Sequence, residues 1–157
     1  MKAFLSYSVN DDSRYLISLL SSKLQDNNFT TSTSNNFFEK ELDYTTKFGI
    51  QNSHLFIGAI TDTGIEKERV LEELAFAQNT KIPNILLIED TVLLDKNYSG
   101  NIVRFNRDAP QTAIEKIEKE MNKKPSKSNT SDLLPWLLAG AAIVAIFYFL
   151  ARKQSQT

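Results

Sequence analysis

Five short segments with the character of strands alternate with amphipathic segments between Lys2 and about Lys124. The strand-like segments span residues 3–6, 29–32, 54–60, 84–88 and 101–104. Regular alternation of strands and helices is typical of α/β domains in which helices cover both faces of a mostly parallel sheet. The pattern therefore predicts a three-layer α/β domain.

Three amphipathic helices are predicted between and after these strands. The first follows a cap at Asp12 or Ser13, the second ends at Asn79 before Pro83, and the third starts after Pro110. Apolar residues recur at helical spacing in each of them: Leu16, Leu20 and Leu24; Val70, Leu71, Leu74 and Ala77, with Gln78 on the same face; and Ala113, Ile114, Ile117 and Met121.

The segment from Thr33 to Tyr44 is the least patterned part of the domain. Long irregular loops in compact α/β units are often binding loops, although some are only connections. Phe37 and Phe38 lie within this loop. We expect them to contact a ligand or partner, with anchoring of the loop on the core as the alternative.

A predicted membrane span begins at Leu133 and ends at Ala151. The segment has no charged residue, and at about 1.5 Å per residue it covers nearly all of a ~30 Å hydrocarbon core. A buried core helix is the alternative. The chain then divides into a domain at 1–122, a polar linker at 123–132, the span at 133–151 and a tail at 152–157. Because no signal peptide precedes the domain, we expect a single-pass protein of the inner or cell membrane with its domain in the cytoplasm.

The composition excludes several chemistries. The chain has no cysteine and a single histidine, His54, and its net charge is -1. Disulfides, a thiol nucleophile, a zinc cluster and a Ser-His-Asp triad are therefore not expected, and neither a metal nor nucleic-acid binding is predicted. Neither a GxGxxG fingerprint nor a GxxxxGK[ST] loop occurs, so a bound nucleotide would be held by side chains and strand ends.

Candidate binding residues follow the first and third predicted strands. Ser6, Tyr7 and Ser8 end the first strand, and Thr61 ends the third. Ligands of open parallel sheets bind beyond the carboxyl ends of the strands, where the strand order reverses. These four residues are therefore candidates for ligand contact.

Helical geometry separates two neighbouring glutamates in the helix at 66–79. With about 100° of rotation per residue, Glu72 points away from the core, whereas Glu73 falls beside Val70 and Ala77 at the edge of the apolar stripe. Glu73 is then either a partly desolvated carboxylate directed at the cleft beyond the third strand or half of an Arg69–Glu73 surface pair worth a few tenths of a kcal/mol. Both interpretations remain open from the pattern alone.

Three sequence stretches together resemble a Toll/interleukin-1 receptor (TIR) domain of the bacterial type. They are KAFLSYS followed by Asp11 and Asp12, IQNSHLFIGAIT at the third strand, and RVLEELAFA in the helix after it. The resemblance covers about residues 2–124. It implies a flavodoxin-like three-layer fold with a five-stranded parallel sheet.

The resemblance also implies an activity, because many TIR domains cleave NAD⁺ at the nicotinamide–ribose bond. NAD⁺ would be the substrate, and no resident cofactor is expected. The family's catalytic glutamate aligns with Glu73, and Arg69 stands where the family has a tryptophan, which removes an aromatic wall for the substrate. Substrate contacts are expected from the full candidate set: Ser6, Tyr7, Ser8, Phe37, Phe38, Thr61 and Arg69. The product would be ADP-ribose or a cyclic or conjugated form of it.

Self-association is the family's usual route to activity, and the resemblance assigns the Thr33–Tyr44 loop to that contact. A membrane tether would raise the effective concentration of the chains. The expected role is antiphage defence or abortive cell death, with other TIR or defence-system proteins as further partners. Two alternatives stay open: a non-catalytic TIR–TIR interaction module at the membrane, favoured by Arg69, and a membrane effector that acts through its helix.

Overall fold

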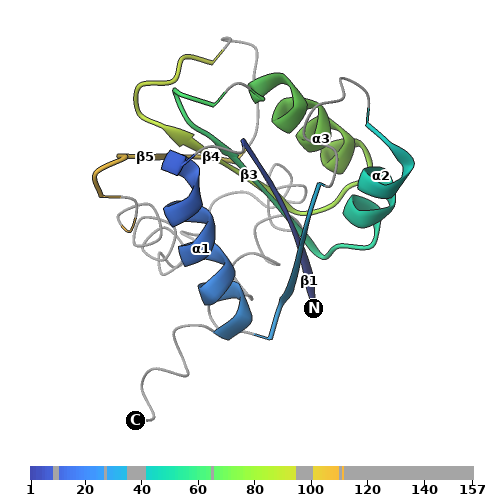
Figure 1. The fold of residues 1–157 in the computed structure, drawn as a ribbon. Helices are drawn as coiled ribbons and strands as arrows, with labels where there is room; N and C mark the ends of the chain where they lie inside the picture. The colour runs from blue at the N-terminus through green and yellow to red at the C-terminus, as the bar shows by residue number, and fades with distance from the viewer. Residues whose placement is uncertain are drawn as a thin grey trace, which may run out of the picture.

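The protein folds as an α/β domain around a five-stranded parallel sheet (Figure 1). The computed structural model describes residues 1–8, 11–26, 28–34, 42–64, 66–94, 101–109 and 111. In chain order the elements are β1 (Lys2–Tyr7), α1 (Asp11–Asp26), β2 (Thr30–Thr33), α2 (Tyr44–Gln51), β3 (Leu55–Ile60), α3 (Lys67–Asn79), β4 (Asn84–Glu89) and β5 (Ile102–Phe105).

The strand order β2-β1-β3-β4-β5 is that of flavodoxin-like doubly wound folds. All four strand pairs are parallel. The connection after β1 leads to β2, which pairs with one edge of β1. The connection after β2 leads to β3, which pairs with the other edge of β1. The carboxyl end of β1 is therefore the topological switch point, where such sheets bind ligands.

Side chains of alternate strand residues build two separate cores. Ala3 and Leu5 of β1 pack beneath α1 together with Leu16, Leu20 and Leu24 of that helix. Phe4 lies on the opposite face, and its cluster includes residues of α2, α3, β3 and β4. Because strand side chains alternate between faces, even-numbered residues of β1 point toward α2 and α3.

The predicted parallel α/β sheet is confirmed, and each predicted strand is found within about one residue of its expected bounds. The helices predicted around Leu20 and Leu74 are α1 and α3. The sequence did not predict α2, which begins inside the segment treated as an irregular loop. Only Thr46 and Ile50 of α2 are buried, so its apolar periodicity is weak.

Two predicted elements lie outside the described residues. These are the helix carrying Ala113 to Met121 and the membrane span at 133–151. Within the part of the chain that the structure describes, no helix has the length and apolar character needed to cross a bilayer.

Candidate functional site

Glu73 is the most deeply buried ionisable side chain near the switch point. It belongs to α3, and none of its surface is exposed. Helical side chains lean toward the amino end of their helix, and the amino end of α3 lies at the carboxyl edge of the sheet. The carboxylate is thereby directed toward that edge, and Glu72 on the preceding position is exposed, as the helical phase predicts.

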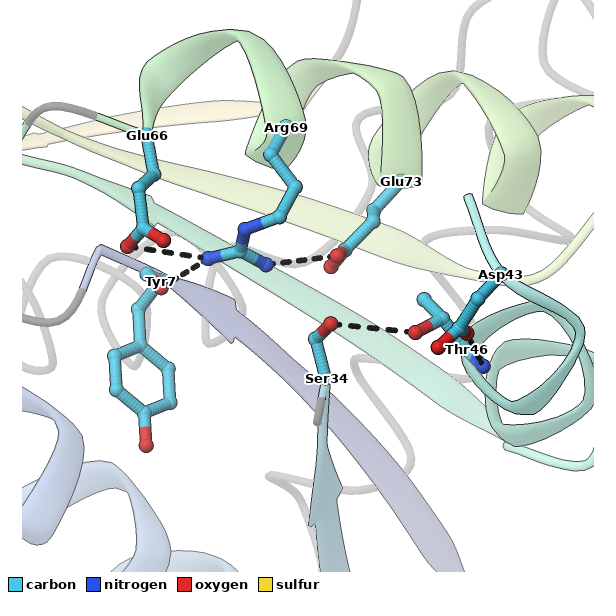
Figure 2. Close-up of polar contacts among 7 residues, drawn as sticks. All are labelled: Tyr7, Ser34, Asp43, Thr46, Glu66, Arg69 and Glu73. Carbon is cyan, nitrogen blue, oxygen red and sulfur yellow. Dashed lines mark hydrogen bonds and ion pairs between the residues drawn. The ribbon is translucent and has the colours of Figure 1, made fainter. Parts of the chain in front are cut away.

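Arg69 joins Glu73 to the end of β1. Its Nη1 donates to Glu73 Oε1 at 2.7 Å, and its Nη2 donates to the Tyr7 carbonyl oxygen, also at 2.7 Å (Figure 2). A second carboxylate, Glu66 Oε2, lies 3.6 Å from Arg69 Nη2. The spacing of Glu66, Arg69 and Glu73 along α3 places all three on one helical face.

This ion pair differs from the surface pair considered from the sequence. The side chains of Arg69 and Glu73 are 7% and 0% exposed. Removing one partner of a buried pair costs about 3–5 kcal/mol because the other charge stays desolvated, whereas exposed helical pairs contribute a few tenths. Glu73 is therefore desolvated and also paired with Arg69, but the pair is buried and not the surface pair considered from the sequence.

Two buried oxygen atoms near this pair have no hydrogen-bond partner among the described residues. They are Glu73 Oε2 and Ser6 Oγ, and both side chains are fully buried. Leaving a buried polar atom unsatisfied costs about 1–3 kcal/mol, so such atoms usually contact water or a ligand. Glu73 thus presents one oxygen held by protein and one oxygen available to another group.

Ser8 and Thr61 lie together at the ends of β1 and β3. Both are buried. A Cβ atom placed on Gly64 would come within 2.5 Å of Ser8 Oγ and 3.1 Å of Thr61 Oγ1. The turn after β3, in which the Gly64 N–H donates to the Thr61 carbonyl at 3.1 Å, therefore packs directly on these two hydroxyls. A side chain at Gly64 would displace them.

Tyr7 contributes its backbone and not its ring to the group around Glu73. Its side chain packs with the core beneath α1. Figure 2 shows the ring directed away from Arg69 and Glu73. Phe37 and Phe38, the other predicted aromatic contacts, lie outside the described residues.

Sequence reasoning missed several polar groups at this edge, among them Glu66 and a buried hydroxyl pair. Ser34 Oγ and Thr46 Oγ1 lie 3.2 Å apart, one after β2 and the other in α2. Asp43 caps α2 by accepting the Thr46 backbone N–H at 2.6 Å, and this hydrogen bond lowers the pKa of Asp43 below its ordinary value. The i, i+3 spacing of Glu66 and Arg69 was visible in the sequence. The Ser34–Thr46 contact depends on the fold.

A second buried carboxylate, Glu89, ends β4. Burial acts to raise its pKa, but two hydrogen bonds from Arg107, at 2.8 and 3.1 Å, and one from the Asp62 backbone N–H at 2.8 Å outweigh it. The pKa of Glu89 is therefore lowered from its ordinary value of 4.5. Because both oxygens of Glu89 have partners, this group ties the ends of β3 and β4 together.

His54 lies away from this edge. Its Nδ1 accepts the Lys2 backbone N–H at 3.1 Å at the amino end of the sheet. This hydrogen bond gives His54 a structural role at the opposite end of the sheet from Glu73. Within the described ranges, no group of three or more His, Cys, Asp and Glu side chains could hold a metal ion.

Comparison with known proteins shows little similarity. No model of a protein family matches the sequence, and no curated protein matches it. Among solved structures, the chain is similar to the Clostridium botulinum CMP N-glycosidase BcmB, with a TM-score of 0.48 and 14% identity over 75% of this chain and 99% of that one. A similarity of this extent supports no argument about the activity of the present chain.

Proposed function

We propose that this protein is a membrane-tethered TIR-type enzyme that cleaves the nicotinamide–ribose bond of NAD⁺, with Glu73 as its catalytic residue. The observation that carries the proposal is the desolvated Glu73 carboxylate at the switch point, with Oε1 held by Arg69 and Oε2 without a hydrogen-bond partner among the residues that the structure describes. The flavodoxin-like strand order supports the sequence resemblance to TIR domains. No resident cofactor is part of the proposal.

One carboxylate is sufficient for this reaction. Breaking the N-glycosidic bond leaves the electron pair on nicotinamide, which departs as a neutral molecule, and the ribose becomes oxocarbenium-like. Glu73 Oε2 would accept a ribose hydroxyl and stabilise the developing positive charge, as carboxylates do in glycosidases. Attack by water at the anomeric carbon gives ADP-ribose and releases a proton; attack by a group of the same molecule gives a cyclic product.

The remaining candidate residues have different roles in this proposal. Ser6 and Arg69 lie on the Glu73 side of the sheet, and Ser8 and Thr61 line its carboxyl edge. Tyr7 acts through its carbonyl oxygen, which orients Arg69. Phe37 and Phe38 remain predicted contacts from the loop.

Full burial of Glu73 favours regulation by assembly. A substrate can reach the carboxylate only after neighbouring groups separate, since none of the side chain is exposed. We propose that self-association of the domains on the cytoplasmic face of the membrane provides that change, in a defence or cell-death response that also involves other TIR or defence proteins. Anchoring through residues 133–151 would concentrate the chains for it.

A non-catalytic interaction module is the second candidate. The observation that favours it is the same pair: Arg69 neutralises Glu73 and occupies one of its oxygens at 2.7 Å. A carboxylate held in this way has a structural use without any substrate. The two candidates differ in whether NAD⁺ is consumed.

The deciding experiment measures NAD⁺ consumption by the full chain in detergent and in vesicles, with products resolved by mass. Glu73→Gln is compared with Glu72→Gln, which changes an exposed carboxylate one position earlier on the same helix. The proposal expects turnover by the wild type and Glu72→Gln and at least a hundredfold loss in Glu73→Gln with folding retained, an order of magnitude typical of electrostatic catalytic groups. Absence of turnover in densely loaded vesicles would favour the interaction module.

A further inference from the structure

Two unsatisfied oxygens and one hydroxyl pair share the same face and the same edge of the sheet. Ser6 follows Phe4 by two residues, so its side chain also points toward α2 and α3. Its Oγ and Glu73 Oε2 are buried and have no hydrogen-bond partner within the described part of the chain. Buried polar atoms of this kind indicate a missing partner such as water or a ligand.

The register of β1 and β2 places Ser34 beside Ser6. Leu5 pairs with Thr33, and the same register continued by one residue brings Ser6 next to Ser34. Ser34 is 1% exposed, and it shares a hydrogen with Thr46 across 3.2 Å. The hydroxyl pair is therefore the lateral neighbour of Ser6 on the sheet.

The packing of α2 places Thr46 at the same level. A Cβ atom on Gly49 would lie 3.0 Å from the Phe4 ring, so Gly49 sits directly over Phe4. Because α2 connects two parallel strands, it runs antiparallel to them, and its earlier residues lie nearer the carboxyl edge of the sheet. Thr46 precedes Gly49 by about one turn and therefore lies nearer that edge than Gly49 does. In the same way, Ser6 lies nearer that edge than Phe4. Figure 2 shows the side chain of Glu73 extending from α3 on the same side of the sheet as the Ser34–Thr46 pair.

We infer that Ser6, Ser34 and Thr46 complete, with Glu73, a recognition site for the vicinal cis-diol of a ribose. Glu73 Oε2 accepts one ribose hydroxyl. Ser6 Oγ forms a hydrogen bond with the second ribose hydroxyl, as donor or acceptor. The Ser34 and Thr46 hydroxyls have two hydrogens between them; one forms the hydrogen bond within the pair, and the other is available to donate to the ribose. The inference rests on the proposed function and adds to it the residues that determine selectivity: Ser34 and Thr46, together with Ser6, favour ribose over 2′-deoxyribose.

The test measures equilibrium binding, which does not require turnover. Calorimetry on the full chain in densely loaded vesicles, the condition in which the proposed function has the site open, compares ADP-ribose with its analogue lacking the 2′-hydroxyl of the terminal ribose. We expect the wild type to bind ADP-ribose at least about tenfold more tightly than the 2′-deoxy analogue, because the analogue leaves one buried polar group of the site without a hydrogen bond. Ser34→Ala and Thr46→Val should reduce the ratio to about threefold or less, while Thr45→Val, an exposed neighbour on α2, should retain it.

The outcomes separate this inference from the proposed function. Ribose discrimination without NAD⁺ turnover would overturn the enzymatic proposal and keep the diol site. Turnover by a wild type that binds both compounds equally would overturn the diol site and keep the enzyme. Absence of ADP-ribose binding, or a ratio unchanged in folded Ser34→Ala and Thr46→Val, would show that these atoms contact only water.

Discussion

The carboxylate of Glu73 has an asymmetric environment that a structural ion pair alone does not require. Arg69 holds one oxygen and is itself fixed by the Tyr7 carbonyl, while the second oxygen lacks a protein partner among the described residues. A purely structural carboxylate at this depth would satisfy both oxygens, as Glu89 does. The contrast between the two glutamates is the residue-level argument for a functional Glu73.

Arg69→Met tests the energetic coupling of the pair. Removing the guanidinium leaves a buried carboxylate without its cation, so we expect the free energy of unfolding to fall by about 3–5 kcal/mol. The double variant Arg69→Met, Glu73→Met removes both charges and should be far less destabilised, since an apolar pair of similar volume replaces them. Urea denaturation followed by circular dichroism measures both. A double variant destabilised as much as Arg69→Met, or more, would contradict a coupled buried pair.

Glu89 predicts a pH dependence of stability. Its pKa in the folded chain lies below the ordinary value of 4.5, so its contribution is present above that pH and is lost as the pH falls through the folded value. Between pH 7 and 3, the melting temperature of the wild type should fall more steeply with decreasing pH than that of Glu89→Gln, whose side chain at position 89 cannot titrate. The exposed Glu72→Gln serves as control and should keep the wild-type slope. Parallel curves for wild type and Glu89→Gln would refute the lowered pKa.

At the scale of elements, the sequence predicted what local pattern determines. Buried strands and the two well-patterned helices, α1 and α3, were found near their expected bounds, and the helical phase separated Glu73 from Glu72. The helix α2 was missed because only two of its side chains are buried. Ser34 and Thr46 were missed for a different reason: their contact depends on strand register and on helix packing between segments 12 residues apart, which periodicity does not encode.

The cap of α2 should control the local stability of this short helix. Asp43→Ala removes the acceptor of the Thr46 N–H, and we expect a loss of about 1 kcal/mol, whereas Asp43→Asn, also a good cap, should lose only a few tenths. Amide hydrogen exchange at Thr46 measures the effect locally, with faster exchange expected in Asp43→Ala. Equal protection in both variants would show that the cap does not hold the amino end of α2.

At the scale of the whole molecule, the proposed mechanism combines the burial of Glu73 with the predicted membrane span. A site that is closed in the single domain needs a second event to open it, and confinement of the chains to a membrane makes encounters between domains frequent. Activity would then depend on surface density and not only on the amount of protein.

Reconstitution at graded protein-to-lipid ratios tests this dependence. With the full chain in vesicles and total protein held constant, NAD⁺ consumption per chain should rise about tenfold or more from sparse to dense loading, because tethering raises the effective concentration of one domain around another. Glu73→Gln at the same densities gives the background, and the wild type in detergent at the same bulk concentration gives the unconfined rate. A rate per chain that stays constant across all densities would mean that the site opens within a single domain and that assembly is not its switch.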